Sequence, residues 1–145
     1  MARSEPTRNR RLLCAVFALT ALAAGLTASA ATAADEIAYG CKLDICLLDP
    51  ANPGAVTNLT DNEGASIDEK PIWSPDGRKV AFISRFASEQ VQTRNLYVME
   101  PEAIEQANNL ATQITHFTHG EYVGGAVWSP DGTLIAFVCG VDEGS

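Results

Sequence analysis

Residues 71–84 read P-I-W-S-P-D-G-R-K-V-A-F-I-S, and residues 126–139 read A-V-W-S-P-D-G-T-L-I-A-F-V-C. Seven of these fourteen positions are identical, and three more exchange Ile for Val. The two copies lie 55 residues apart in a chain of 145 residues. Two occurrences of W-S-P-D-G in so short a chain indicate an internal repeat, and a repeat of this spacing indicates an architecture of stacked units.

Each copy predicts a β-hairpin. A short apolar strand ends at Trp73 or at Trp128, and a second strand follows at residues 80–83 or 135–138. In the turn between them, Pro presets φ at the first central position, Asp suits the second, and Gly tolerates a positive φ. The matching places of the two Trp predict packing between units. The residues assigned to this structural repeat are Trp73, Ser74, Pro75, Asp76, Gly77, Trp128, Ser129, Pro130, Asp131 and Gly132.

Weaker echoes extend the repeat to the rest of the chain. They pair residues 37–40 with 80–83, residues 44–50 with 95–101, and residues 57–60 with 115–118. The changing offsets place insertions at residues 85–94 and 102–111, the second of which could form a helical turn or two.

The repeated unit has four short antiparallel strands in about 43 to 55 residues, which is the size of a propeller blade. We therefore expect an all-β chain with an incomplete ring of about two to two and a half blades. Strands of a first blade are expected at residues 37–60, a complete second blade at 71–118, and the start of a third at 126–139.

The W-S-P-D-G copy at residues 71–84, followed by N-L-Y-V-M-E at residues 95–100, resembles the repeat of TolB-type β-propellers. The same repeat occurs in the propellers of prolyl-oligopeptidase-type peptidases. The resemblance covers residues 36–139 and implies a ring of six to eight blades, usually extracytoplasmic, with a binding face. Periplasmic members act as protein-interaction scaffolds, and others sit beside a hydrolase domain and restrict access to it.

A closed ring of six blades needs roughly 260 residues, so this chain is expected to be a partial propeller. It is either a truncated product or a short protein that completes its ring by assembly. In both cases we expect an open arc with exposed strand edges at both ends, and self-assembly through those edges is one consequence.

Residues 1–33 predict a signal peptide. A basic segment is followed by an apolar run and by two A-x-A patterns, at residues 28–30 and 31–33. We favour cleavage after the second pattern, with the first as the other site. An uncleaved membrane anchor is the alternative. Cleavage leaves residues 34–145 as an extracytoplasmic protein, periplasmic or secreted, without membrane insertion.

The charge of that mature part is strongly negative. The whole chain has 10 Lys+Arg and 18 Asp+Glu, and the leader carries four Arg and one Glu. Residues 34–145 therefore hold six basic and 17 acidic residues, for a net charge of −11. A surface of this sign repels nucleic acid and anionic headgroups, so no nucleic-acid partner is expected.

Three cysteines remain in the mature part. Cys41 and Cys46 flank the predicted tip of a hairpin, and export favours a disulfide between them over two free thiols. Cys139 is equivalent to Cys41 in the repeat. Its partner is expected beyond Ser145, which would leave one free thiol.

No catalytic constellation, cofactor site or metal site is expected. The chain has no G-x-S-x-G elbow and no Gly-rich phosphate loop. Asp76 and Asp131 are explained by their turns. His116 and His119 point to opposite faces of a strand, so they do not converge on a metal.

The sequence thus predicts an exported, non-enzymatic propeller segment that binds an envelope or extracellular protein, or a small ligand. The insertions at residues 85–94 and 102–111 are the expected contact loops, because loops carry binding. The alternative is a fragment of the propeller domain of a secreted prolyl-oligopeptidase-type hydrolase.

Overall fold

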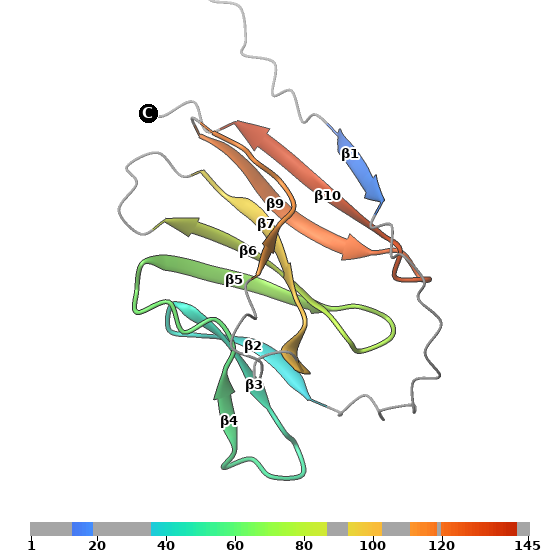
Figure 1. Ribbon diagram of the computed structural model, residues 1–145. Helices are drawn as coiled ribbons and strands as arrows, with labels where there is room; N and C mark the ends of the chain where they lie inside the picture. The colour runs from blue at the N-terminus through green and yellow to red at the C-terminus, as the bar shows by residue number, and fades with distance from the viewer. Residues whose placement is uncertain (1–12, 19–35, 87–92, 103–110, 119, 142–145) are drawn as a thin grey trace, which may run out of the picture.

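The computed structural model describes residues 13–18, 36–86, 93–102, 111–118 and 120–141 of the chain (Figure 1). Over these residues the protein is all-β, with three antiparallel sheets and no α-helix. The sheets form an open arrangement. The predicted all-β class and antiparallel strands are therefore confirmed.

The ten strands are β1 (Leu13–Ala18), β2 (Ile37–Cys41), β3 (Asp44–Leu48), β4 (Val56–Asn58), β5 (Ser66–Trp73), β6 (Val80–Phe86), β7 (Asn95–Met99), β8 (Thr112–Gln113), β9 (Glu121–Trp128) and β10 (Leu134–Val141). The first sheet has the strand order β2-β3-β4, the second β5-β6-β7-β8, and the third β1-β10-β9. The two long hairpins, β5–β6 and β9–β10, turn at the two W-S-P-D-G copies.

The second sheet lies between the other two and is buried on both faces. Its side chains alternate along each strand, as the two-residue period of a strand requires. One face meets the first sheet through a cluster of Ile45, Leu47, Leu59, Val80, Phe82 and Met99. The opposite face meets the third sheet through a cluster of Ala81, Ile83, Leu96, Val98, Val123, Trp128, Ile135, Phe137 and Cys139. We call these contacts the first junction and the second junction.

The outer edge of β10 is covered by β1 (Figure 1). The pairing is antiparallel and joins Leu13 to Val138 and Ala18 to Leu134. The exposed edge was expected for residues 34–145, which do not include β1, so it stays a prediction for that part of the chain. At the other end, the described part of the first sheet leaves β2 paired only with β3, so that edge is open.

β1 belongs to the segment predicted as a signal peptide, and the rest of residues 1–33 lies outside the described residues. Export therefore stays a prediction. Within the described ranges, no helix has the length and apolarity needed to cross a membrane.

The two predicted insertions are only partly covered by the structure. β6 continues to Phe86, so the first insertion begins as strand, and residues 87–92 lie outside the described part. Most of the second insertion, residues 103–110, also lies outside it, together with the helical turn expected there.

Candidate functional site

The two W-S-P-D-G turns share one hydrogen-bond pattern. The N–H of Gly77 donates to the carbonyl of Ser74 at 2.9 Å, and Gly77 has a φ of 68°. The Ser74 hydroxyl donates to the Asp76 carboxylate at 2.6 Å and accepts from the N–H of Lys79 at 2.9 Å. The second turn repeats these bonds among Ser129, Asp131, Gly132 and Leu134. Pro75 and Pro130 occupy the first central positions, so both motifs act as turns.

The two turn carboxylates are engaged within their own turns. The Ser129 hydroxyl, with the N–H and hydroxyl of Thr133, lowers the pKa of Asp131 from 3.8 to about 2. The Ser74 hydroxyl likewise lowers the pKa of Asp76. Both residues are exposed and bonded locally, which is what a structural role requires.

The two motif Trp side chains lie at sheet junctions but differ in their partners. Trp128 is 8% exposed, and its indole Nε1 donates to the carbonyl of Ile72 at 3.2 Å. The Nε1 of Trp73 is also buried, but it has no hydrogen-bond partner among the residues that the structure describes. The packing role is thus shared, while the inter-sheet hydrogen bond is made only by Trp128.

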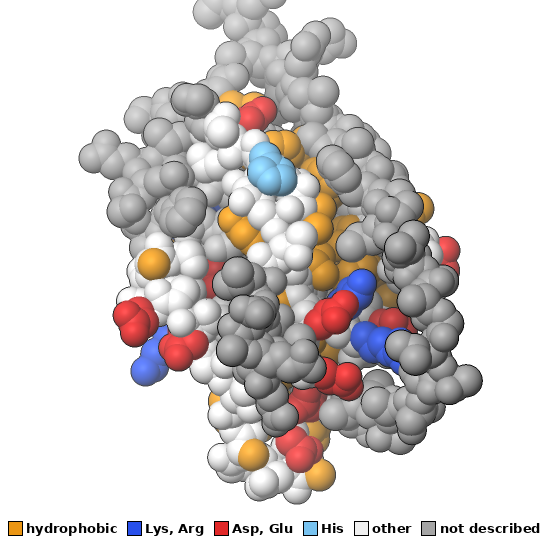
Figure 2. Space-filling view, in the orientation of Figure 1, with side chains coloured by type: hydrophobic (Ala, Val, Ile, Leu, Met, Phe, Trp, Pro, Cys, Tyr) orange, Lys and Arg blue, Asp and Glu red, His pale blue; other side chains and the backbone are white. Residues whose placement is uncertain are grey.

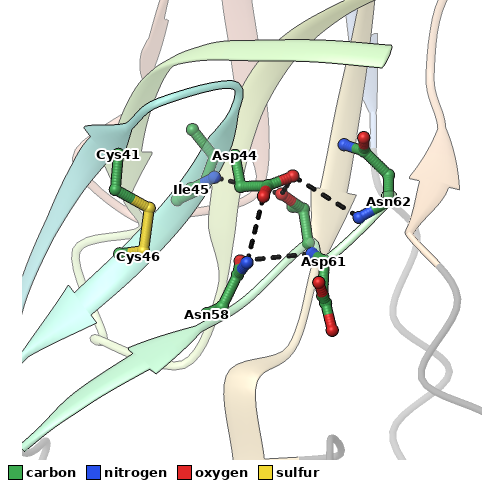
Figure 3. The surroundings of a disulfide bond; sticks show 8 residues. Cys41, Asp44, Ile45, Cys46, Asn58, Asp61 and Asn62 are labelled. Atoms are coloured by element: carbon green, nitrogen blue, oxygen red, sulfur yellow. Dashed lines mark hydrogen bonds between the residues drawn. A yellow bond between two sulfur atoms is a disulfide. The ribbon is translucent and has the colours of Figure 1, made fainter. Parts of the chain in front are cut away.

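The β2–β3 hairpin is joined by a disulfide between Cys41 and Cys46, whose Cα atoms are 5.7 Å apart (Figure 3). This pairing agrees with the sequence and is compatible with an oxidising environment. Cys139 is disulfide-bonded as well, and its partner lies outside the described side chains. The expectation that Cys139 lacks a partner within the chain is therefore wrong.

A threonine hydroxyl joins the last segment of the first sheet to β3. The Thr60 Oγ1 accepts from the N–H of Ile45 at 3.0 Å and faces a carboxylate oxygen of Asp44 at 3.5 Å. Asp44 also accepts from the side chain of Asn58 at 3.0 Å and from the N–H of Asn62 at 3.4 Å (Figure 3). We call this arrangement the threonine latch.

The second sheet has the same latch. The Thr115 Oγ1 accepts from the N–H of Leu96 and donates to Asn95, both at 2.9 Å. Asn95 in turn accepts from the N–H of Phe117 at 2.7 Å. Asn95 and Thr115 are both buried, so this second latch is shielded from water.

The latches correct the predicted alignment of the weakest echo. The sequence paired Thr60 with Thr118, at an offset of 58, but the hydrogen bonds make Thr60 equivalent to Thr115. The correct offset is 55, which is the offset between the two motif Trp. The pairing of residues 57–60 with 115–118 is wrong because matching Thr letters does not show which hydroxyl meets the backbone.

A main-chain hydrogen bond also recurs at each junction. The N–H of Asp68, in β5, donates to the carbonyl of Leu43 at 2.8 Å, and the N–H of Val123, in β9, donates to the carbonyl of Arg94 at 3.0 Å. Leu43 and Arg94 directly precede the acceptor residues of the two latches. β5 is thus bonded to the first sheet in the same way as β9 is bonded to the second sheet.

The first junction contains a cavity of about 250 Å³. It is lined by Leu59, Thr60, Asn62, Ser66, Asp68, Phe82, Ser84, Tyr97, Met99 and Ala111. The Asp68 side chain is the charged group of this cavity, and Asp68 is only 5% exposed. Burial, with a smaller contribution from the nearby Asp68 carboxylate, raises the pKa of Tyr97. The cavity is the candidate binding site among the described residues.

The second junction is apolar at two of the corresponding places. By the offset of 55, Val123 stands where the first junction has Asp68, and Phe117 stands where it has Asn62. Val123 is fully buried, and Phe117 packs against the core with an edge-to-face contact to Phe137. The repeat therefore does not require a carboxylate at residue 68.

Sequence reasoning missed Asp68 and Asn62. Asp68 precedes the first W-S-P-D-G copy by only a few residues, but the match stopped at Pro71. If the alignment of the two copies is extended upstream at the same offset, Asp68 aligns with Val123. An aspartate at a position where the other copy has a valine is the sequence signal for this site.

The other sequence candidates add nothing to this cavity. His116 is exposed (Figure 2), and His119 lies outside the described residues. Among the residues the structure describes, no three His, Cys, Asp or Glu side chains gather as metal ligands.

Comparisons with known proteins give one relative. The uncharacterized peptidase YuxL of Bacillus subtilis (strain 168) is 39% identical over 91 residues, which is 63% of this chain. The chain spans only 12% of the length of that protein. No family model matches the chain, and no solved structure matches it.

Proposed function

We propose that this chain is part of an extracytoplasmic β-propeller, of the TolB-like type, and that it serves as a non-enzymatic binding scaffold. The observation that carries the proposal is the recurrence of one hydrogen-bond frame at both sheet junctions. The threonine latch and the bond from the next sheet recur with offsets of 51 and 55 residues. Sheets that bind their neighbours in the same way are the units of a repeat architecture.

The cavity of the first junction supports the binding role that we propose. The cavity of the first junction combines one buried carboxylate with hydroxyl groups and aromatic walls. No described nucleophile is paired with a histidine base there, since its polar side chains are Thr60, Asn62, Ser66, Asp68, Ser84 and Tyr97. A pocket between two sheets, with apolar walls and a few polar groups, is the kind of place where small ligands and side chains bind.

The experiment is to detect the protein in the cells that produce it, with an antibody against residues 66–100. Extracytoplasmic and cytoplasmic fractions are compared, and each is treated with a fluorophosphonate probe that labels active serine hydrolases. The scaffold predicts an extracytoplasmic species without label. A species found only in the cytoplasm, or a species that carries the label, contradicts it.

The second candidate is the propeller region of a secreted hydrolase, and the similarity to the peptidase YuxL supports it. In this case the antibody detects a much larger protein, and that protein carries the fluorophosphonate label. The same blot therefore separates the two candidates.

A further inference from the structure

The cavity of the first junction holds a buried carboxylate that the repeat does not need. Asp68 is 5% exposed, and its equivalent in the second junction is the fully buried Val123. A carboxylate removed from water is costly unless a positive charge or several hydrogen bonds compensate for it. Asp68 accepts two side-chain hydrogen bonds, but no described ion pair supplies it with a positive charge.

The hydrogen-bond partners of the Asp68 side chain among the described residues are neutral. One carboxylate oxygen accepts from the Asn62 side chain at 2.9 Å, and the other accepts from the Ser66 hydroxyl at 3.1 Å. In Figure 3 the backbone N–H of Asn62 points toward Asp44, whereas the side chain of Asn62 is directed away from Asp44. The ion pairs of the described residues lie elsewhere, at Lys79–Glu100 and Arg94–Glu69. The Asp68 carboxylate can therefore accept a cationic ligand as its ion-pair partner.

The remaining walls define the shape of that cation. The rings of Phe82 and Tyr97 are stacked with centroids 5.7 Å apart, and Leu59 and Met99 add aliphatic surface. Aromatic faces attract a cation, and aliphatic walls favour an alkyl chain behind it. The 250 Å³ of the cavity corresponds to roughly eight water volumes, which suits a short alkyl amine.

We propose that this cavity binds a primary alkylammonium group, with Asp68 as its counter-ion and the Phe82–Tyr97 pair as its aromatic wall. The proposal deepens the scaffold function and rests on it, because it names the chemical class that the scaffold recognises. The group is either a free amine or the side chain of a lysine in a peptide. The acidic character of the mature chain favours the approach of such a cation.

The test is a binding titration of the full chain at pH 7, followed by NMR of the backbone amides. The probes are n-pentylammonium, n-pentanol, Nα-acetyl-lysine methylamide and Nα-acetyl-norleucine methylamide. We expect each ammonium probe to bind at least tenfold more tightly than its neutral counterpart, since a charge-assisted hydrogen bond contributes about this factor or more. Tighter binding of the lysine probe than of pentylammonium identifies a peptide side chain, and the reverse order identifies a free amine.

The variant Asp68→Asn should lose at least tenfold in affinity for the ammonium probes, and Asp76→Asn, in an exposed turn of the same sheet, should bind as the parent does. If Asp68→Asn does not fold, the proposal is tested by comparing the affinities of the charged and neutral probes for the parent chain. Equal binding of pentanol and pentylammonium, unchanged affinity in folded Asp68→Asn, or no binding at all overturns the proposal. A negative result for ammonium binding does not contradict the scaffold function, because the antibody and fluorophosphonate experiment tests that function independently.

Discussion

The indole Nε1 of Trp128 donates a hydrogen bond to the carbonyl of Ile72, 3.2 Å away and in the neighbouring sheet. Ile72 directly precedes Trp73, whose own buried Nε1 has no acceptor in the described part of the chain. One motif Trp therefore joins two sheets by packing and a hydrogen bond, and the other by packing alone. This asymmetry makes the pair a matched test of what the hydrogen bond contributes.

Trp128→Phe should lower the free energy of unfolding by about 1 kcal/mol more than Trp73→Phe does, because only the first change removes a formed hydrogen bond. The second change also removes a buried N–H that lacks an acceptor, which offsets part of its packing loss. Chemical denaturation of the two variants and the parent gives the comparison. A larger loss for Trp73→Phe would contradict the assigned contacts.

Thr115→Val should destabilise the chain by about 1–3 kcal/mol, since it preserves the shape of the side chain but leaves the buried Leu96 N–H without this acceptor and removes one of the two hydrogen bonds that the Asn95 oxygen accepts. Thr60→Val should cost less, because its latch is only partly buried and its contact with Asp44 is longer. Thr112→Val, at an exposed position of β8, is the control and should be close to neutral. Urea unfolding curves measure all three, and equal effects at residues 112 and 115 would refute the latch.

The turn at Asp131 should contribute to the pH dependence of stability. Its folded pKa of about 2 lies below the ordinary value of 3.8, so the folded carboxyl binds its proton less tightly than the unfolded one. The contribution is complete above about pH 4 and is lost as the pH falls toward 2.

Asp131→Asn should remove this contribution between pH 4 and 2, and Ser129→Ala should raise the pKa of Asp131 toward its ordinary value. NMR titration of the Asp131 side chain gives the pKa in the parent and in Ser129→Ala. A parent pKa near 3.8 would show that the turn hydrogen bonds do not hold in solution.

Removing the Cys41–Cys46 disulfide with the double change Cys41→Ser and Cys46→Ser should cost about 2 kcal/mol, the chain-entropy value for so short a loop. The loss should be concentrated in the first junction, where β2 and β3 pack. Hydrogen exchange of Ile45 and Leu47 reports this junction, and that of Ile135 reports the second as a control. Alkylation of Cys41 in the unreduced protein would contradict the pairing.

The strands and turns followed from the sequence because the W-S-P-D-G copies combine a turn signal with a fixed spacing. Both hairpins lie where Trp73 and Trp128 place them. Other features depend on contacts that a letter-by-letter comparison does not contain. The latch partner of Leu96 is Thr115 rather than Thr118, and only the geometry of the hydroxyl shows it.

The pairing of β1 with β10 and the buried Asp68 were missed for different reasons. The residues of β1 were assigned to the leader and so were excluded from the sheets. The burial of Asp68 could not be predicted from its residue type, because most carboxylates of an acidic chain are exposed. Comparison with Val123 at the repeat offset reveals it, since a position that one unit fills with valine is an interior position.

The second sheet is covered on both faces, whereas the first and third are each held by one junction. Either outer sheet can therefore separate from the molecule while the rest stays assembled, but the middle sheet can open only after both contacts are lost. Amide protons of β6 and β7 should accordingly exchange with solvent last, and by global unfolding, while those of β2 and β9 exchange through smaller openings. The molecule is in this sense a short chain of three cooperative units with its most persistent member in the centre.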